Sequence, residues 1–215
     1  MKRFVIYAVV VTLCWFTNPL KSFSQDVTWE INNPYPLTET KWKQLMSDNE
    51  EIINQYEGQE LSKLPERKRD EYLIALAKRA ILTFGPAYYR EYKQPIIREG
   101  VFPPTEYKEH WSRAEQSYYE VLFPYDISKE LFTCTFVARV FIMKADASLA
   151  FLIIGSNENA FMFTSKENET KRRLSYLEDR SKCLPYRSIP FSDTSYREEI
   201  LQKVRQELEK YHLQE

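Results

Sequence analysis

The chain has 215 residues, of which 43% are hydrophobic and 28% are charged, and its formal net charge is −1 at pH 7. This length and composition are typical of one globular domain and exclude a largely disordered chain. A near-neutral chain has no overall basic charge to attract nucleic acid. The four glycines, at positions 58, 85, 100 and 155, lie too far apart for a phosphate-binding loop. We therefore predict neither a nucleic-acid nor a nucleotide partner.

The first 24 residues have the pattern of a secretory signal peptide. Lys2 and Arg3 precede an apolar run over residues 4–16, and small residues occupy the −3 and −1 positions of a cleavage site after Ser24. The run is short for a membrane span, so only an uncleaved segment would attach the protein to a membrane. The sequence around the site resembles the cleavage region of envelope proteins of Gram-negative bacteria. We expect an exported protein, periplasmic or extracellular, in which residues 25–215 form a single domain.

Two amphipathic helices are predicted in the first half of the exported chain. Residues 39–57 carry apolar side chains at helical spacing and are followed by a glycine. Residues 65–84 carry a second apolar stripe with a 3.6-residue period, with Pro65 in the first turn and Gly85 at the end. The linker between them is short, so we expect an antiparallel helical hairpin that packs on a sheet.

Residues 86–125 form the most aromatic and least regular stretch of the chain. Short strands are expected at 96–97 and 121–123, and a helix within 106–119. Two interpretations of the aromatic side chains remain open: they pin a long loop to the core, or they line a binding surface, since tyrosine and tryptophan combine an apolar ring with a polar tip. The candidate binding surface consists of Tyr88, Tyr89, Tyr92, Tyr107, Trp111, Tyr118 and Tyr119.

The sequence pattern of residues 131–165 predicts an antiparallel meander of three strands, which we expect to be the centre of the fold. Apolar, β-branched and aromatic runs are separated by turn residues at 144–146 and 155–159. The second strand is apolar on both faces, which a single helical layer cannot bury, so the aromatic loop or a partner must cover the second face. Arg139 lies on the mixed face of the first strand, where a buried guanidinium needs an ionic partner.

Two further helices are predicted after the meander. One occupies residues 165–180, and the last begins near 193–195, where Ser195 and Glu198 have capping-box spacing. The expected fold class is α+β: an antiparallel sheet of three to five strands, packed by the helical hairpin and the C-terminal helix.

The predicted exported chain keeps two cysteines, Cys134 and Cys183. In an oxidising compartment they could form a disulfide, and closing a loop of this length would stabilise the fold by about 4 kcal/mol. The alternative is a pair of buried free thiols, because cysteine is a common small core residue. Composition does not decide between the two.

Motifs for metal binding and catalysis are scarce. His110 and His212 are the only histidines, neither has a metal-binding cluster beside it, and there is no Gly-x-Ser-x-Gly sequence. We predict no metal and no cofactor, and we assign no catalytic residue.

Two functions are compatible with these observations. The first is a non-enzymatic envelope protein that binds another protein or a cell-surface glycan through the aromatic-rich region. The alternative is a small hydrolase that acts on glycan or peptidoglycan with acidic residues. A deep cleft that brings Glu106, Glu109 or Glu115 beside Trp111 would favour the hydrolase, and an exposed aromatic patch would favour binding.

Overall fold

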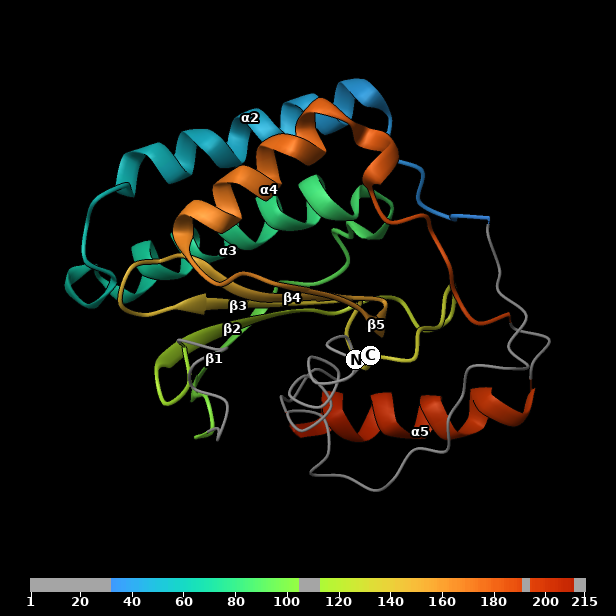
Figure 1. Ribbon diagram of the computed structural model, residues 1–215. Helices are drawn as coiled ribbons and strands as arrows, with labels where there is room; N and C mark the ends of the chain where they lie inside the picture. The colour runs from blue at the N-terminus through green and yellow to red at the C-terminus, as the bar shows by residue number, and fades with distance from the viewer. Residues whose placement is uncertain (1–31, 105–112, 191–193, 211–215) are drawn as a thin grey trace, which may run out of the picture.

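The computed structural model describes residues 32–104, 113–190 and 194–210 (Figure 1). Five strands form one antiparallel sheet in which each strand lies beside its neighbours in sequence. The strands are β1 (Ile96–Val101), β2 (Ser117–Phe123), β3 (Ala138–Met143), β4 (Leu149–Ile154) and β5 (Ser156–Met162). The predicted α+β class with an antiparallel sheet is confirmed.

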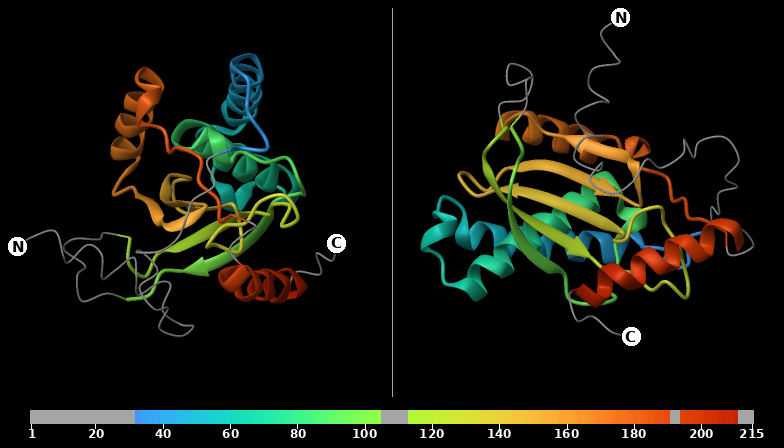
Figure 2. Two further views of the ribbon diagram at one scale, coloured as in Figure 1. Left: turned by 90° about the vertical axis from the view of Figure 1, so that its right-hand side faces the viewer. Right: turned by 90° about the horizontal axis from the view of Figure 1, so that it is seen from below.

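Four helices accompany the sheet within the described residues: α2 (Glu39–Tyr56), α3 (Glu66–Phe84), α4 (Lys166–Glu178) and α5 (Thr194–Lys210). Helices α2 and α3 form the predicted hairpin, and α4 lies beside α3 on the same side of the sheet (Figure 1). Helix α5 lies on the opposite side (Figure 2). The two faces of the sheet are therefore covered by different parts of the chain.

The helices begin and end where local chemistry satisfies their terminal backbone groups. The Thr38 side chain accepts a hydrogen bond from the Lys41 amide at the start of α2, and Ser165 accepts one from the Asn168 amide at the start of α4. Helix α3 follows a proline and ends where the Gly85 amide donates to a carbonyl of its last turn. These signals explain why sequence periodicity located the helices to within a residue or two.

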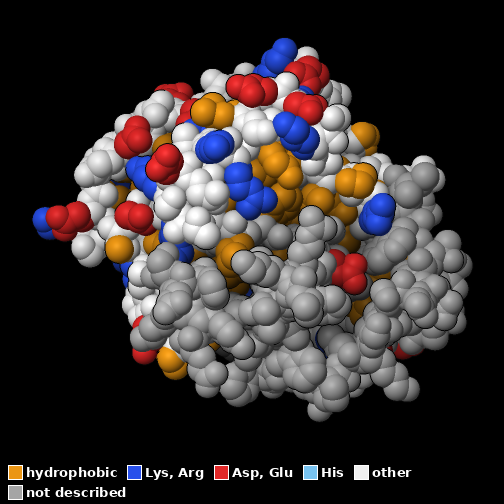
Figure 3. Space-filling view, in the orientation of Figure 1, with side chains coloured by type: hydrophobic (Ala, Val, Ile, Leu, Met, Phe, Trp, Pro, Cys, Tyr) orange, Lys and Arg blue, Asp and Glu red, His pale blue; other side chains and the backbone are white. Residues whose placement is uncertain are grey.

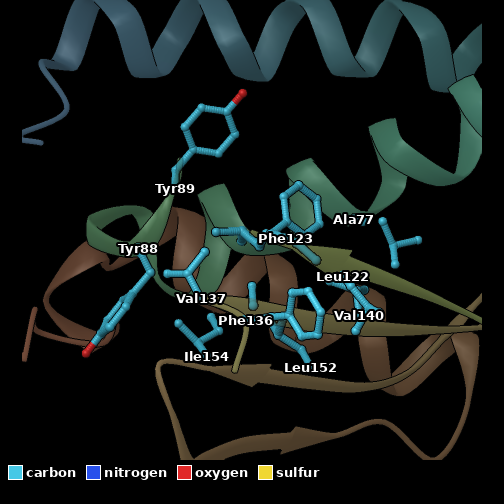
Figure 4. Packing of buried hydrophobic residues seen from close by; sticks show 14 of the residues in the cluster. Ala77, Tyr88, Tyr89, Leu122, Phe123, Phe136, Val137, Val140, Leu152 and Ile154 are labelled. Carbon is cyan, nitrogen blue, oxygen red and sulfur yellow. The ribbon is translucent and has the colours of Figure 1, made fainter. Parts of the chain in front are cut away.

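Helix α3 supplies most of the contact between the helical layer and the sheet. Its buried side chains face β2, β3 and β4, and Ala77 lies above Leu122 and Val140 in Figure 4. Each large apolar side chain buried here contributes about 1.5–3 kcal/mol relative to an exposed one.

The second face of the sheet is buried by a smaller cluster centred on Phe102, Phe141 and Phe151. The Phe102 ring comes from the chain just after β1 and lies 5.7 Å from the Phe151 ring, centre to centre. All six residues of β4 are buried, which requires cover on both faces. Phe102 belongs to this cluster and Ala114 packs against it, so described residues before and after 105–112 contribute to covering the second face.

Three predicted elements differ from those observed. The first meander strand begins at Ala138, and residues 131–137 bend although several of their side chains are buried. The expected turn at 155–159 is limited to Gly155, whose positive φ of 63° allows β5 to start at once. Residues 117–119 belong to β2 and not to a helix, whereas residues 105–112 lie outside the described part of the chain.

Candidate functional site

Three of the seven aromatic residues predicted to form a binding surface are buried in the core. Tyr88, Tyr89 and Tyr119 are at most 6% exposed. The Tyr88 ring packs against Phe132, and its hydroxyl donates to the Pro185 carbonyl at 2.9 Å. Burial raises the pKa of the Tyr88 and Tyr89 hydroxyls, as expected for rings removed from water. These three side chains therefore pin their part of the chain to the core and do not line an exposed surface.

Two of the other four residues lie in the described part of the chain, in different environments. Tyr118 is half-buried on the second face of the sheet, with its ring 4.3 Å from that of Phe102. Tyr92, just before β1, is 40% exposed. Tyr107 and Trp111 lie outside the described residues. The described members of the set therefore do not form one exposed aromatic patch.

Arg139 has the ionic partner that its position required. Its guanidinium donates from Nε and Nη2 to Oε1 of Glu120, at 2.7 and 2.6 Å, and Arg98 donates to Oε2 of the same carboxylate. Glu120 is buried in the middle of β2, whereas both arginines reach the surface. The three charges join β1, β2 and β3 on the second face of the sheet.

Two other buried carboxylates also have structural partners. Glu130 forms a bidentate ion pair with Arg90, and Glu169 of α4 accepts a hydrogen bond from the Leu149 amide at 2.9 Å. Together with Glu120, these are the buried carboxylates of the described chain. Each one is occupied in joining elements, so none is positioned as a free general acid or base.

Of the two alternatives for Cys134 and Cys183, the structure has the thiols and not the disulfide. The Cys134 thiol lies 3.2 Å from the Asn157 side-chain oxygen at the start of β5, whereas the Cys183 thiol donates to the Thr83 carbonyl at the end of α3. Burial raises the pKa of the Cys183 thiol, which keeps it protonated and unreactive. The thiols bond to different elements, which is why they do not meet.

An open groove of about 730 Å³ lies between the α2–α3 hairpin and β1; we call it the β1 groove. Its apolar lining is Ile52, Ile74, Ala75, Pro95 and Ile97, and its polar lining is Asn49, Glu66, Arg67, Asp70, Glu71, Lys78 and Gln94. The apolar residues of the lining are buried or half-buried, whereas most of the charged ones are exposed. Apolar surface combined with a few polar groups is typical of a site that binds a partner or ligand.

The charges around the β1 groove are of both signs. Glu71 accepts a hydrogen bond from the Tyr56 hydroxyl at 3.2 Å. The pKa of this hydroxyl is raised, mainly because the group is buried and also because the Glu71 carboxylate lies beside it, so the hydroxyl keeps its proton and remains a donor. Glu66, Arg67 and Lys78 form no ion pair with any described residue. Acidic and basic side chains are also interspersed over the helical side of the molecule (Figure 3). A mixed rim of this kind favours a protein or glycan partner over a polyanion.

Strand β1 forms an edge of the sheet beside this groove. Its hydrogen bonds show which of its backbone N–H and C=O groups point toward β2 and which point outward, away from the sheet. The Phe102 amide donates to the Gln116 carbonyl, so Phe102 points toward β2. Backbone direction alternates along a strand, so the amides and carbonyls of Ile97, Glu99 and Val101 point away from β2.

The pairing of β2 with β3 gives the same assignment independently. The carbonyls of Ser117 and Phe123 accept hydrogen bonds from the chain on the β3 side, so odd-numbered residues of β2 bond to β3. The even-numbered residues of β2 then bond to β1, and in the observed register they lie opposite Ile96, Arg98 and Gly100. The odd-numbered residues of β1 are left with outward N–H and C=O groups.

The opposite edge of the sheet is better protected. A register shift interrupts the pairing of β4 with β5 between Ile153 and Ile154, and Arg172 of α4 donates to the Met162 carbonyl at 2.8 Å. Irregular pairing and nearby charged groups are common means of preventing edge-to-edge association. By contrast, Val101 on β1 is 61% exposed and Tyr92 lies exposed just before the strand.

No family model, curated protein or solved structure matches the chain. None of the helices in residues 32–104, 113–190 and 194–210 combines the length and the apolar character of a membrane span. The same residues contain no group of three or more His, Cys, Asp and Glu side chains that could hold a metal ion. The β1 groove, with its apolar and charged lining, and the adjoining edge of β1, with the exposed Val101, form the candidate functional site.

Sequence reasoning missed this site. It predicted a short strand at 96–97, but not that the strand is longer, lies at the edge and borders a groove formed by helices distant in sequence. The one available signal was Pro95, since a proline at the start of a strand is typical of an edge position.

Proposed function

We propose that this chain is an exported protein of the cell envelope that binds another protein or a cell-surface component without catalysing a reaction on it. The observation that carries the proposal is the β1 groove, which adjoins a sheet edge with outward backbone groups and an exposed apolar residue, Val101. Both Tyr92 and β1 belong to the aromatic-rich stretch 86–125, so the proposed surface lies at the border of the region first considered for binding.

The arrangement of ionisable groups supports binding over catalysis. The described buried carboxylates are paired with arginines or with the backbone, and the groove charges that form no ion pair with any described residue, Glu66, Arg67 and Lys78, are of both signs along α3. A catalytic site needs groups that converge on one reacting position and whose pKa values suit proton transfer at the working pH.

Site-directed photo-crosslinking tests the proposal. A photo-reactive amino acid replaces Lys78, which lines the β1 groove, and a matched control replaces Gln202 on the exposed side of α5. Irradiation of the native envelope fraction should give a discrete adduct at Lys78 and none at Gln202. Absence of an adduct at Lys78 with either protein or peptidoglycan would contradict the proposal.

Export is a separate part of the proposal and has its own test. It rests on the signal-peptide pattern of residues 1–24. Cell fractionation should recover the protein outside the cytoplasm, and sequencing of its N-terminus should begin at Gln25. A cytoplasmic protein that retains Lys2 and Arg3 would contradict export.

A hydrolase remains the second candidate because three carboxylates, those of Glu66, Asp70 and Glu71, line the β1 groove. Of the acids first considered, Glu115 lies in a turn with a positive φ of 63°, and Glu106 and Glu109 lie outside the described residues. Turnover of purified peptidoglycan that is lost on Glu71→Gln would reverse the order of the two candidates. We expect no turnover.

A further inference from the structure

We propose that the partner enters as an extended peptide strand that pairs with β1 and places its side chains over the β1 groove. This inference rests on the proposed binding function and specifies the chemical class of the partner: a protein segment in β conformation. Strand addition to a sheet edge uses backbone hydrogen bonds for affinity and side-chain pockets for specificity.

The backbone of β1 is prepared for such pairing. The outward N–H and C=O groups belong to Ile97, Glu99 and Val101, which are the alternate residues that one added antiparallel strand would bond. Outside the pairing of β1 with β2, none of these three amides donates to another described residue. Pro95 precedes the strand, so it removes no donor from this outward set.

The side chains of β1 predict the pattern of the incoming strand. Ile97, Glu99 and Val101 share the face toward the helices, and Ile97 also lines the groove. Glu99 forms an ion pair with Lys144, but its side chain is 56% exposed and can accept a second cation. The complementary strand carries apolar residues opposite Ile97 and Val101 and a basic residue opposite Glu99, the pattern apolar-x-basic-x-apolar.

A second copy of this chain fits the edge less well. Residues opposite each other in a continuous antiparallel sheet point to the same face, so a two-fold axis must pass midway between one residue of β1 and the same residue of the copy. The two registers that keep most of the strand paired are centred on Arg98 or on Glu99. Each places a charged side chain directly opposite its own copy, which is destabilising. A foreign strand avoids this repulsion.

Amide hydrogen exchange with a defined peptide tests the proposal. The probe is acetylated and amidated Thr-Val-Thr-Lys-Thr-Val-Thr, and the matched control replaces its lysine with glutamate. At millimolar concentration the lysine peptide should slow exchange at Ile97, Glu99 and Val101, while Gly100, which bonds to β2, remains unchanged. Its apparent Kd should be lower than that of the glutamate peptide by up to about fivefold.

Two variants make the result specific to this edge. Glu99→Lys should invert the preference, so that the glutamate peptide binds more tightly. Val101→Pro removes an outward donor without removing a bond to β2, and should weaken protection by the peptide at Ile97 and Glu99, whereas Val101→Thr should retain it. An unchanged exchange rate at Gly100 shows that each variant is folded.

Unchanged exchange at all three outward amides with both peptides would overturn strand addition. So would equal protection by the two peptides in the parent protein and in Glu99→Lys. In either case an adduct at Lys78 in the crosslinking experiment would still support the proposed binding function, and its absence would remove that function as well. A change of oligomeric state that depends on Val101 would indicate a second copy and would also overturn the proposal.

Discussion

Arg90 and Glu130 form a bidentate ion pair that is closed to solvent. The two Nε–Oε1 and Nη2–Oε2 distances are 2.6 and 2.7 Å, and the side chains are 2% and 0% exposed. The remaining nitrogen of the guanidinium donates to the carbonyls of Ala87 and Tyr89, and the Tyr186 hydroxyl donates to Glu130. One buried pair thus joins the turn after α3, the loop between β2 and β3, and the chain after α4.

Removing the carboxylate from this pair should be among the most destabilising single changes. Glu130→Leu leaves the Arg90 guanidinium buried and uncompensated, and we expect a loss of about 3–5 kcal/mol in the free energy of unfolding. Urea denaturation measures it. The matched control, Glu199→Gln, breaks an exposed pair with Lys203 and should cost at most about 1 kcal/mol. Similar costs for the two variants would show that the buried Arg90–Glu130 pair does not hold these three parts of the chain together.

Arg98, Glu120 and Arg139 form an ion-paired cluster on the second face of the sheet, and replacing its members should lower the free energy of unfolding by unequal amounts. Arg139→Met leaves Glu120 paired with Arg98, and Arg139 is partly exposed, so the loss in unfolding free energy should be about 1–2 kcal/mol. Glu120→Leu removes the shared carboxylate of both pairs and leaves two partly solvated guanidiniums, so the loss should be larger, about 2–3 kcal/mol. Denaturation of the two variants side by side gives the comparison. The reverse order would mean that Arg98 does not neutralise Glu120 in solution.

The helices were predictable because their signals are local. The apolar period of residues 66–84 and the flanking Pro65 and Gly85 are complete within the sequence itself, and so is the Thr38 cap of α2. The start of β3 was not predictable to the residue. Residues 131–137 are as apolar as a strand, but they are buried as a bent segment, and burial alone does not distinguish the two.

The candidate site could not be read from the sequence because it depends on long-range pairing. Which strand lies at the edge follows from the pairing order, which a list of predicted strands does not determine. The aromatic residues misled for a related reason: Tyr88 and Tyr119 have polar tips that suit either a surface or a core, and only the packed structure shows that both are buried. A half-buried guanidinium needs an ionic partner, so the sequence predicts that Arg139 has one. That this partner is Glu120 follows only from the register of β2 and β3.

Gly100 provides a test of how closely β1 approaches the Tyr118 ring on the second face of the sheet. A Cβ at this position would meet the tip of the Tyr118 ring, and that ring is confined by Phe102 and Phe141. Gly100→Ala should therefore destabilise the fold by about 1–3 kcal/mol, measured by urea denaturation. The double variant with Tyr118→Ala should cost less than the sum of the two single changes. Gly58, whose added Cβ meets nothing, is the control: Gly58→Ala should show no coupling to Tyr118→Ala.

The free thiols give a chemical check on the cysteine assignment. Denatured protein that has not been reduced should be alkylated at both Cys134 and Cys183, as located by peptide mass mapping. In the folded protein both should react slowly, because Cys134 is buried and burial raises the pKa of the Cys183 thiol. Recovery of a single disulfide-linked peptide before reduction would contradict the structure.

Buried tyrosines predict that the fold loses stability at alkaline pH. Burial raises the pKa of the Tyr186 hydroxyl to about 12, whereas an unfolded tyrosine titrates near pH 10. Between these values the unfolded state releases the proton and the folded state retains it. The contribution of Tyr186 to the free energy of unfolding should therefore be constant below about pH 10 and be lost as the pH rises toward 12. Denaturation at several pH values gives this slope, which should be shallower for Tyr186→Phe than for the parent protein. An equal slope in the parent protein and Tyr186→Phe would mean that Tyr186 titrates alike in the folded and unfolded states.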